Sequence, residues 1–332
     1  MTNHRFASDP STSLRASLES TFCPICGSAR APTLRYDFAP YRVVRCPHCG
    51  LVFLSPRLTE SAILKLYSDQ EYYVSEVSGQ GYDEYLEVRH NWIKTFTRRL
   101  EQIANYQSPI TNYQLPITNY QLPITNYQLP GRVLDIGCGP GFFLEAAQAK
   151  GYDAFGLDPS DYIVKVASEK FGERIQKGVI ESADYPADHF DLVVAFDTFE
   201  HVYHPLEWLT AVRRVLRSPD PASGKPGGLL AITTPDPTSP LAKISGRKWV
   251  SFKIPEHVFY WSPDTIRRVL AEGWEILEIK PAGQYASLSF LFRRLFRLPS
   301  NPRGIIKWKL DLLKKFSIYS DNGSMTVIAR KR

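Results

Sequence analysis

Four cysteines near the start of the chain form two Cys-x-x-Cys pairs. Cys23-Pro-Ile-Cys26 and Cys46-Pro-His-Cys49 are separated by 19 residues, a spacing typical of a tetrahedral four-thiolate zinc site. Four cysteine ligands leave no open coordination position for chemistry, so the pattern predicts a structural Zn²⁺. We expect the fifth cysteine, Cys138, to be a small buried residue.

A glycine-rich turn follows a short apolar run in the middle of the chain. The segment Val-Leu-Asp-Ile-Gly-Cys-Gly-Pro-Gly at 133–141 places Gly137, Gly139 and Gly141 where a buried strand must turn into a helix. Glycine permits unusual φ values there and lets a ligand approach the backbone closely. Asp158 lies 21 residues after Gly137, near the position where a carboxylate binds ribose hydroxyls in a mononucleotide-binding unit. Together these features predict a nucleoside site.

The charge beside this turn indicates which nucleoside it binds. Asp135 precedes the glycines, where it would repel the pyrophosphate of a dinucleotide. S-adenosylmethionine has no phosphate and carries an ammonium and a sulfonium group, so it suits an acid before the turn and another at the ribose. The spacing G-x-G-x-G also differs from the G-x-G-x-x-G of NAD enzymes. We therefore expect S-adenosylmethionine as the ligand.

Alternating apolar runs supply the elements that would position these residues. The pattern predicts strands at 132–136, 154–157, 190–196, 228–233, 274–280 and 325–330, and helices at 142–150, 162–171 and 206–216. Such alternation specifies a parallel sheet covered by helices on both faces.

Composition divides the chain into five parts. We expect a disordered N-terminus at 1–20, a zinc ribbon at 21–55, a helical connector at 56–104, a linker at 105–130, and an α/β domain at 131–332 with a helical insertion at about 283–322. The linker repeats Pro-Ile-Thr-Asn-Tyr-Gln-Leu, and a proline in every copy excludes a coiled coil. We interpret it as a repeat expansion at a surface connection.

The bulk composition excludes several classes of protein. The 332 residues carry 40 Lys and Arg against 34 Asp and Glu, a net charge of +6 that is too small for a dedicated nucleic-acid binder. No window reaches the roughly 18 consecutive apolar residues of a membrane span, and the first twenty residues lack the apolar run of a secretory signal. We expect a cytoplasmic protein.

Four ordered motifs within about 131–280 resemble the class I S-adenosylmethionine-dependent methyltransferases. They are the glycine turn, Gly-Leu-Asp-Pro-Ser at 156–160, Phe-Asp-Leu-Val-Val-Ala-Phe-Asp-Thr-Phe-Glu-His-Val at 190–202 and Pro-Gly-Gly-Leu-Leu-Ala-Ile-Thr-Thr-Pro at 226–235. The resemblance implies a Rossmann-like, doubly wound, mostly parallel seven-stranded sheet, here preceded by a small zinc ribbon and a helical segment.

The same resemblance assigns residues to the cofactor. It implies that Asp135 and the glycines hold the methionine part, that Asp158 binds the ribose, and that the adenine lies near Val179, where family members often carry an aspartate. The expected cofactor set comprises Asp135, Gly137, Gly139, Gly141, Phe142, Asp158, Val179, Ile180, Glu181 and Phe196.

Acids and histidines follow the predicted strand at 190–196. Methyl transfer is an in-line displacement, so the protein must align a nucleophile and remove its proton. Asp197, Glu200 and His201 can orient a base or hold a divalent cation, and they resemble a segment of quinone-biosynthesis O-methyltransferases for which that family implies a metal. Alternatively, His201 caps the following helix and Glu200 is solvated. His257 is a second candidate base.

Three functional hypotheses follow. The stretch from the cysteines to Tyr72-Tyr73 resembles the N-terminal part of bacterial methyltransferases of sugars and small metabolites, which favours O- or C-methylation of a small or carrier-linked polar acceptor, such as a polysaccharide precursor. A zinc-ribbon RNA methyltransferase is the alternative, although Asp-Thr-Phe-Glu at 197–200 differs from the segment typical of base-amine methylation. The third is a cofactor-binding scaffold. The basic, apolar stretch at 290–315 is expected to cap the site, or else to contact a membrane peripherally.

Overall fold

The computed structural model describes residues 17–68, 89–107, 131–296, 312–314 and 316–332. The repeat copies, Tyr72-Tyr73, most of the expected disordered N-terminus and the greater part of the 290–315 stretch lie outside these residues.

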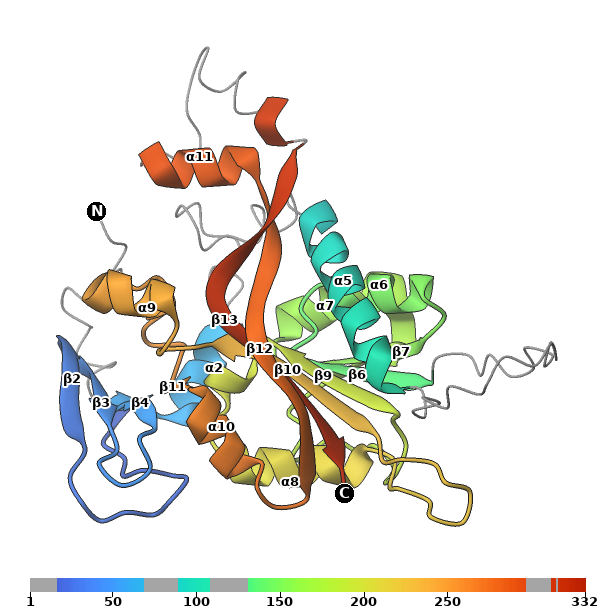
Figure 1. Cartoon of the computed structure of the whole chain (residues 1–332), viewed down its shortest axis with the longest axis horizontal. Coiled ribbons are helices and arrows are strands. Elements are labelled where there is room, and N and C mark those ends of the chain that lie inside the picture. Colours follow the sequence, from blue (N-terminus) through green and yellow to red (C-terminus); the bar gives the residue numbers. More distant parts are fainter. Residues whose placement is uncertain (1–16, 69–88, 108–130, 297–311, 315) are drawn as a thin grey trace, which may run out of the picture.

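A seven-stranded sheet forms the larger half of the molecule (Figure 1), with the strand order β12-β13-β10-β9-β6-β7-β8. Its strands are β6 (Arg132–Ile136), β7 (Asp153–Asp158), β8 (Ile175–Lys177), β9 (Leu192–Phe196), β10 (Leu229–Pro235), β12 (Trp274–Ser287) and β13 (Ser317–Lys331). The first five run parallel, whereas β13 is antiparallel to both of its neighbours. The predicted Rossmann-like fold is confirmed.

Helices cover both faces of this sheet because its central strands are apolar on both sides. On one face pack α5 (Arg89–Gln107), α6 (Phe142–Ala149) and α7 (Asp161–Phe171); on the other pack α8 (Pro205–Val215) and α10 (Pro263–Val269). In β9 every residue is buried, as expected for a central parallel strand.

The N-terminal residues form a second, antiparallel sheet. It contains β2 (Thr33–Phe38), β3 (Tyr41–Arg45), β4 (Val52–Leu54) and, at its edge, β11 (Phe259–Tyr260) from far along the chain. A two-stranded sheet of β1 (Leu18–Glu19) and β5 (Arg57–Leu58) and the helix α2 (Glu60–Ser68) complete this part. The N-terminal sheet is thus completed by a strand from the half of the chain that forms the large sheet.

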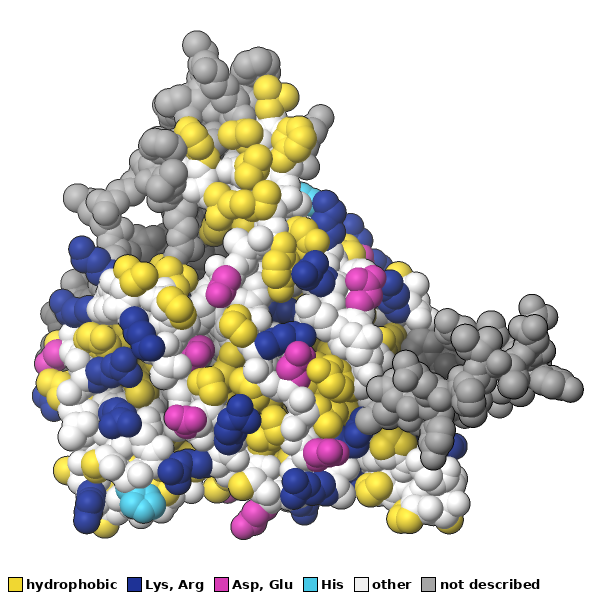
Figure 2. Space-filling view, in the orientation of Figure 1, with side chains coloured by type: hydrophobic (Ala, Val, Ile, Leu, Met, Phe, Trp, Pro, Cys, Tyr) yellow, Lys and Arg dark blue, Asp and Glu magenta, His cyan; other side chains and the backbone are white. Residues whose placement is uncertain are grey.

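Beyond the large sheet, β12 and β13 continue as a twisted hairpin that leads to α11 (Leu288–Phe296) (Figure 1). Figure 2 shows apolar side chains gathered on this projection, where Phe292, Phe316 and Ile318 are exposed. Strand therefore occupies both ends of the expected insertion at 283–322. None of the described helices is long and apolar enough to cross a membrane.

Three short helical segments lie near the carboxyl edge of the sheet or in the connection after β10. They are η2 (Phe199–His201), α9 (Pro240–Ser245) and η3 (Gly246–Lys248), while η1 (Gly172–Arg174) leads into β8.

Candidate active site

The glycine turn joins β6 to α6 in a conformation that only glycine adopts readily. Gly137, Gly139 and Gly141 have φ values of 75°, 51° and 83°. A Cβ atom at Gly137 would lie 2.5 Å from Thr198 Oγ1, and one at Gly141 would overlap the Phe171 ring. The turn therefore leaves its backbone open and packs directly against the segment that follows β9.

Two buried carboxyl groups flank the turn. Asp158 Oδ2 accepts a hydrogen bond from Gly139 N at 3.1 Å, and its Oδ1 accepts from Ser160 N at 3.0 Å. Burial raises the pKa of Asp158 to about 6, although these two hydrogen bonds oppose the shift. Burial, and then the Asp158 charge, raise the pKa of Asp135 well above its usual range. The pair places two carboxyl groups beside the turn, an arrangement that suits a cationic ligand.

The residues expected at the adenine follow β8, beside Asp158. Gly178 N donates to the Asp158 carbonyl at 3.0 Å, which brings 179–181 to the same edge of the sheet. Ile180 is fully buried, Val179 is half-buried and Glu181 is exposed. This edge therefore offers backbone groups and apolar surface of the kind that an adenine ring could contact.

Arg99 of α5 lies near Asp135, and its charge opposes the rise of the Asp135 pKa. This residue was not identified from the sequence. Its side chain is 3% exposed, yet none of its guanidinium nitrogens makes a hydrogen bond within the described part of the chain. The guanidinium lies 4.9 Å from the ring centre of Phe196, and its Nη1 lies 3.8 Å from Asp197 Oδ2. A buried cation with free donors is suited to a carboxylate ligand.

A second group of side chains consists of Glu200, His201 and His257, which we name the Glu-His cluster. One ligand atom from each lies within 4.8 Å of the others. Glu200 Oε1 is 3.9 Å from His257 Nε2, and the two imidazole rings are perpendicular with centres 4.7 Å apart. Glu200 is 1% exposed, so it is not a solvated side chain, and His204 occupies the N-cap of α8 in place of His201.

Each imidazole of the cluster has its Nδ1 engaged elsewhere. His257 Nδ1 donates to the Ser251 carbonyl at 2.9 Å, and His201 Nδ1 lies 3.0 Å from the Tyr67 hydroxyl. The Nε2 atom of His257 therefore presents a lone pair toward Glu200. Contacts of this kind fix the ring orientation of metal-binding histidines.

Burial sets the charges in the cluster. It lowers the pKa of His201 to about 4 and that of His257 well below its usual range, with the Lys253 charge adding to both shifts. Burial and the Asp197 charge raise the pKa of Glu200 to about 8. At neutral pH both histidines are therefore uncharged, and the Glu200 carboxyl is mostly protonated.

Asp197 is not among the three residues whose ligand atoms converge, although the sequence grouped it with them. It adopts a φ of 55°, which is costly for a residue other than glycine. Its backbone N–H donates to the Thr233 carbonyl at 2.9 Å, and its carboxylate pairs with Arg99. Asp197 thus faces Arg99, while its charge still raises the pKa of Glu200.

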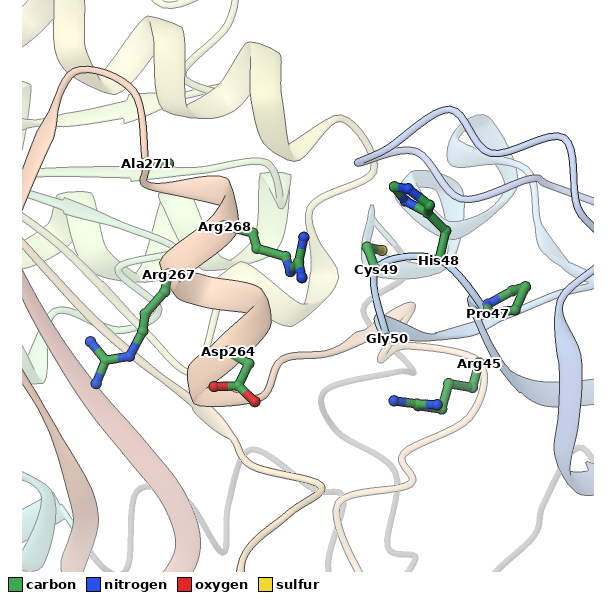
Figure 3. A pocket seen from close by; sticks show the side chains of 9 residues that line it. All are labelled: Arg45, Pro47, His48, Cys49, Gly50, Asp264, Arg267, Arg268 and Ala271. Carbon is green, nitrogen blue, oxygen red and sulfur yellow. The ribbon is translucent and has the colours of Figure 1, made fainter.

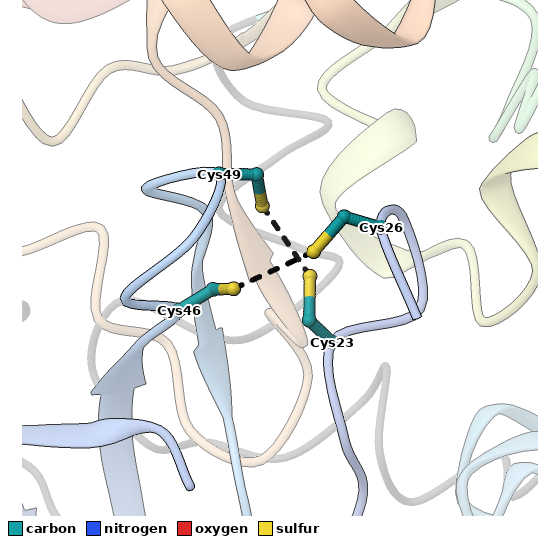
Figure 4. Close-up of side chains that lie close together, drawn as sticks. All are labelled: Cys23, Cys26, Cys46 and Cys49. Carbon is teal, nitrogen blue, oxygen red and sulfur yellow. Dashed lines mark hydrogen bonds between the residues drawn. The ribbon is translucent and has the colours of Figure 1, made fainter. Parts of the chain in front are cut away.

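The four paired cysteines converge, with their sulfur atoms pointing toward one another (Figure 4). Cys23 and Cys49 have sulfurs 3.4 Å apart, those of Cys26 and Cys46 are 3.6 Å apart, and all four lie within 4.8 Å. Thiolates about 2.3 Å from a central Zn²⁺ would lie about 3.8 Å from one another. The arrangement fits a four-thiolate zinc ion.

Comparison with known proteins agrees with this geometry. A family model described as a methyltransferase domain matches residues 111–279, just over half of the chain. The chain belongs to this methyltransferase family. This is the methyltransferase family that the sequence motifs predicted.

Curated relatives of the methyltransferase include ubiquinone biosynthesis O-methyltransferases. The one from Cereibacter sphaeroides (strain ATCC 17025) is 34% identical over 138 residues, which cover 40% of this chain and 53% of the relative. The one from Dinoroseobacter shibae is 31% identical over 175 residues, covering 48% and 67%. The methyltransferase spans about half the length of the first of these relatives.

Solved structures similar to the methyltransferase carry the same general description. One is a SAM-dependent methyltransferase from Archaeoglobus fulgidus, with 19% identity, a TM-score of 0.47, and coverage of 75% of this chain and 99% of that one. Another, from Thermotoga maritima, is described as a possible histamine N-methyltransferase, with 18% identity, a TM-score of 0.44, and coverage of 76% and 95%.

A hollow of about 530 Å³ lies between the second cysteine pair and α10 of the methyltransferase. Arg45 and Arg268 extend toward it from opposite sides, whereas Arg267 points away (Figure 3). Its lining contains none of the residues of the glycine turn or the Glu-His cluster. This basic hollow is therefore separate from the candidate active site.

Proposed function

We propose that this methyltransferase transfers the methyl group of S-adenosylmethionine to an oxygen atom of a small polar acceptor, free or carrier-linked. The close approach of Gly137 and Thr198 supports the proposal, because Thr198 directly precedes the η2 turn that contains Glu200 and His201. The Glu-His cluster therefore lies near the glycine turn. An acceptor hydroxyl beside the cluster would then lie next to the methyl donor. The names of the curated relatives support an oxygen acceptor, and the N-terminal resemblance favours a sugar or polysaccharide precursor.

For the donor we propose a division of roles around the turn. Asp135 and Arg99 face the ammonium and carboxylate of the methionine part, and Asp158 accepts the ribose hydroxyls. The glycines provide close backbone approach, and Phe142 and Phe196 provide apolar walls. The segment at 179–181 covers the adenine. The burial and orientation of Asp135, Asp158 and Arg99 support these roles.

The binding of S-adenosylmethionine should weaken in acid. The ionised Asp158 accepts hydroxyl hydrogen bonds better than the protonated form, and burial raises its pKa to about 6. Affinity should therefore be constant above pH 7 and fall by up to about tenfold per pH unit below 6. Calorimetric titrations between pH 5 and 8 check this expectation. Equal affinity at pH 5 and pH 7.5 would contradict the role of Asp158.

Within the proposed function, the Glu-His cluster holds a divalent cation. Two imidazole nitrogens and one carboxylate form a suitable donor set, and the engaged Nδ1 atoms support ligation through Nε2. A cation at this point would supply positive charge that favours ionisation of an acceptor hydroxyl. In the second candidate mechanism, the half-buried His201 accepts the acceptor's proton directly.

Titration with Mn²⁺ separates these two mechanisms. The zinc-loaded wild-type protein should bind one further ion, and His257→Ala should weaken that binding by about tenfold or more, since one of three ligands is lost. His204→Ala is the matched control, because this exposed histidine lies at the N-cap of α8. If folded wild-type protein binds no Mn²⁺ while His201→Ala stops methyl transfer, the direct-base mechanism replaces the cation.

We also propose a structural Zn²⁺ at Cys23, Cys26, Cys46 and Cys49. The convergence of four sulfurs at tetrahedral spacing supports it. All four positions are filled by protein thiolates, so the ion would hold the ribbon together and take no part in methyl transfer.

A further inference from the structure

One short segment of the catalytic half lies between the ribbon and the Glu-His cluster. Val258 follows His257 directly, and its carbonyl accepts a hydrogen bond from Leu54 N of β4 at 2.9 Å. On its other side, Val258 N donates to the carbonyl of Glu200 at 3.0 Å. The backbone of a single residue, Val258, thus connects β4, an inner strand of the ribbon sheet, to Glu200 and to the neighbouring His257.

The next residues extend this connection. Phe259 pairs with Phe53 in the ribbon sheet, and both side chains are fully buried. Trp261 Nε1 donates to the carbonyl of Phe199 at 3.4 Å, and the two rings stack with centres 4.8 Å apart. Since Phe199 begins the η2 turn that carries Glu200 and His201, β11 packs between the ribbon and that turn.

The ribbon side reaches the cluster at two further points. The Tyr67 hydroxyl of α2 lies 3.0 Å from His201 Nδ1. The Tyr203 hydroxyl, two residues beyond His201, donates to the Leu58 carbonyl at 2.9 Å, and the Arg57 guanidinium lies 4.2 Å from the Tyr203 ring centre. Contacts from residues 17–68 therefore reach His201 directly, and they reach His257 through its neighbour Val258.

The cofactor turn is packed differently. Cys138 and Phe142 belong to an apolar cluster formed with α5, α6 and α7, on the opposite face of the sheet. Cys23, Cys46 and Cys49 share the other cluster with β11 and Phe199. Loosening of the ribbon would therefore disturb the Glu-His cluster before it disturbs the glycine turn.

We infer that the cysteine ribbon is a positioning element for the acceptor side of the active site, with Tyr67 as a positioning residue for His201. This inference rests on the proposed role of the Glu-His cluster. A zinc ion at the cysteines would act on methyl transfer only by holding β4, and through it Val258 and His257. The ribbon is then part of the acceptor site and not a separate docking module.

Two variants of the full chain test the inference. Cys49→Ser removes one sulfur of the zinc site, and metal analysis should show zinc falling from one to none per chain. Tyr67→Phe removes only the hydroxyl beside His201. Tyr36→Phe is the matched control, because it makes the same change within the ribbon, where its ring packs against Phe252 and not against the cluster.

Three readouts are needed: calorimetric affinity for S-adenosylhomocysteine, affinity for Mn²⁺, and the ¹⁵N signals of the histidine rings. We expect S-adenosylhomocysteine affinity to change by less than about twofold in all variants. Mn²⁺ affinity should fall by about tenfold in Cys49→Ser and Tyr67→Phe, a typical effect of losing an outer contact of a metal ligand. The ring signals of His201 and His257 should shift in Cys49→Ser, and those of His201 in Tyr67→Phe.

The possible failures can be told apart. If the histidine signals stay unchanged in both variants, or if Tyr36→Phe shifts them as much as Tyr67→Phe does, the positioning role is wrong. Equal losses of cofactor and Mn²⁺ affinity in Cys49→Ser, with no effect of Tyr67→Phe, would also overturn it, because the ribbon would then stabilise the whole fold. Absence of Mn²⁺ binding in the wild type contradicts the cation role alone, and the ring signals still test the positioning.

Discussion

Glu200→Gln is expected to lower the rate of methyl transfer by about 10²–10⁴-fold while leaving the affinity for S-adenosylmethionine nearly unchanged. Burial raises the pKa of Glu200 to about 8, so its carboxyl is mostly neutral at pH 7. Glutamine has the same shape and no charge, so the variant should fold. It cannot ionise, however, and its neutral amide oxygen is a weaker ligand for a divalent cation than a carboxylate.

Transfer of labelled methyl from S-adenosylmethionine to a mixture of small phenols and sugars measures this effect. Glu207→Gln is the matched control, because Glu207 is exposed on α8, and it should retain the wild-type rate. Cofactor binding by Glu200→Gln shows that the variant is folded. A wild-type rate in that folded variant would remove the Glu-His cluster from the mechanism.

The second large effect concerns the donor. Asp158→Ala should weaken the binding of S-adenosylhomocysteine by at least about 100-fold, because two hydroxyl contacts to a charged acceptor contribute about 1.5–3 kcal/mol each. The substitution also leaves Gly139 N and Ser160 N without their carboxylate acceptor, which loosens the turn. Calorimetric titration measures the loss directly.

Asp161→Ala provides the control for this variant. Asp161 is exposed at the start of α7, and its contact with Lys177 is a surface ion pair, which contributes little. We expect wild-type affinity from it. If the affinity of Asp158→Ala for S-adenosylhomocysteine is within about threefold of the wild-type value, Asp158 does not contact the ribose. The assignment of Asp158 to the donor site would then be wrong.

The sequence predicted the parallel core well because that core has strong local signals. Apolar runs with few interruptions give β6 and β9, and the glycine turn indicates where β6 ends. The three-residue β8 was too short to be recognised. Only the parts of β12 and β13 at 274–280 and 325–330 were predicted as strands. The rest of the hairpin lies beyond the core and contains polar residues such as Gln284 and Asp321, so it lacks an apolar pattern.

The parts of the site that depend on distant contacts could not be predicted. Glu200 and His257 are far apart in the chain and meet because β11 joins the ribbon sheet, a pairing that two residues, Phe259 and Tyr260, cannot signal by periodicity. Arg99 did leave a trace, because it falls on the apolar stripe of α5 between Phe96 and Leu100, where a cation would need a partner. Asp197 was grouped with Glu200 and His201 by its spacing and by the resemblance, whereas its backbone turns its side chain toward Arg99.

Calorimetric titration of the folded, zinc-loaded protein with S-adenosylmethionine tests the central claim most directly. We predict micromolar binding of one molecule per chain, and comparable or tighter binding of S-adenosylhomocysteine, because the pocket recognises the adenosine and amino-acid parts that both share. No heat of binding from folded protein at pH 7.5 would contradict the assignment of the glycine turn, Asp135 and Asp158 as the donor site.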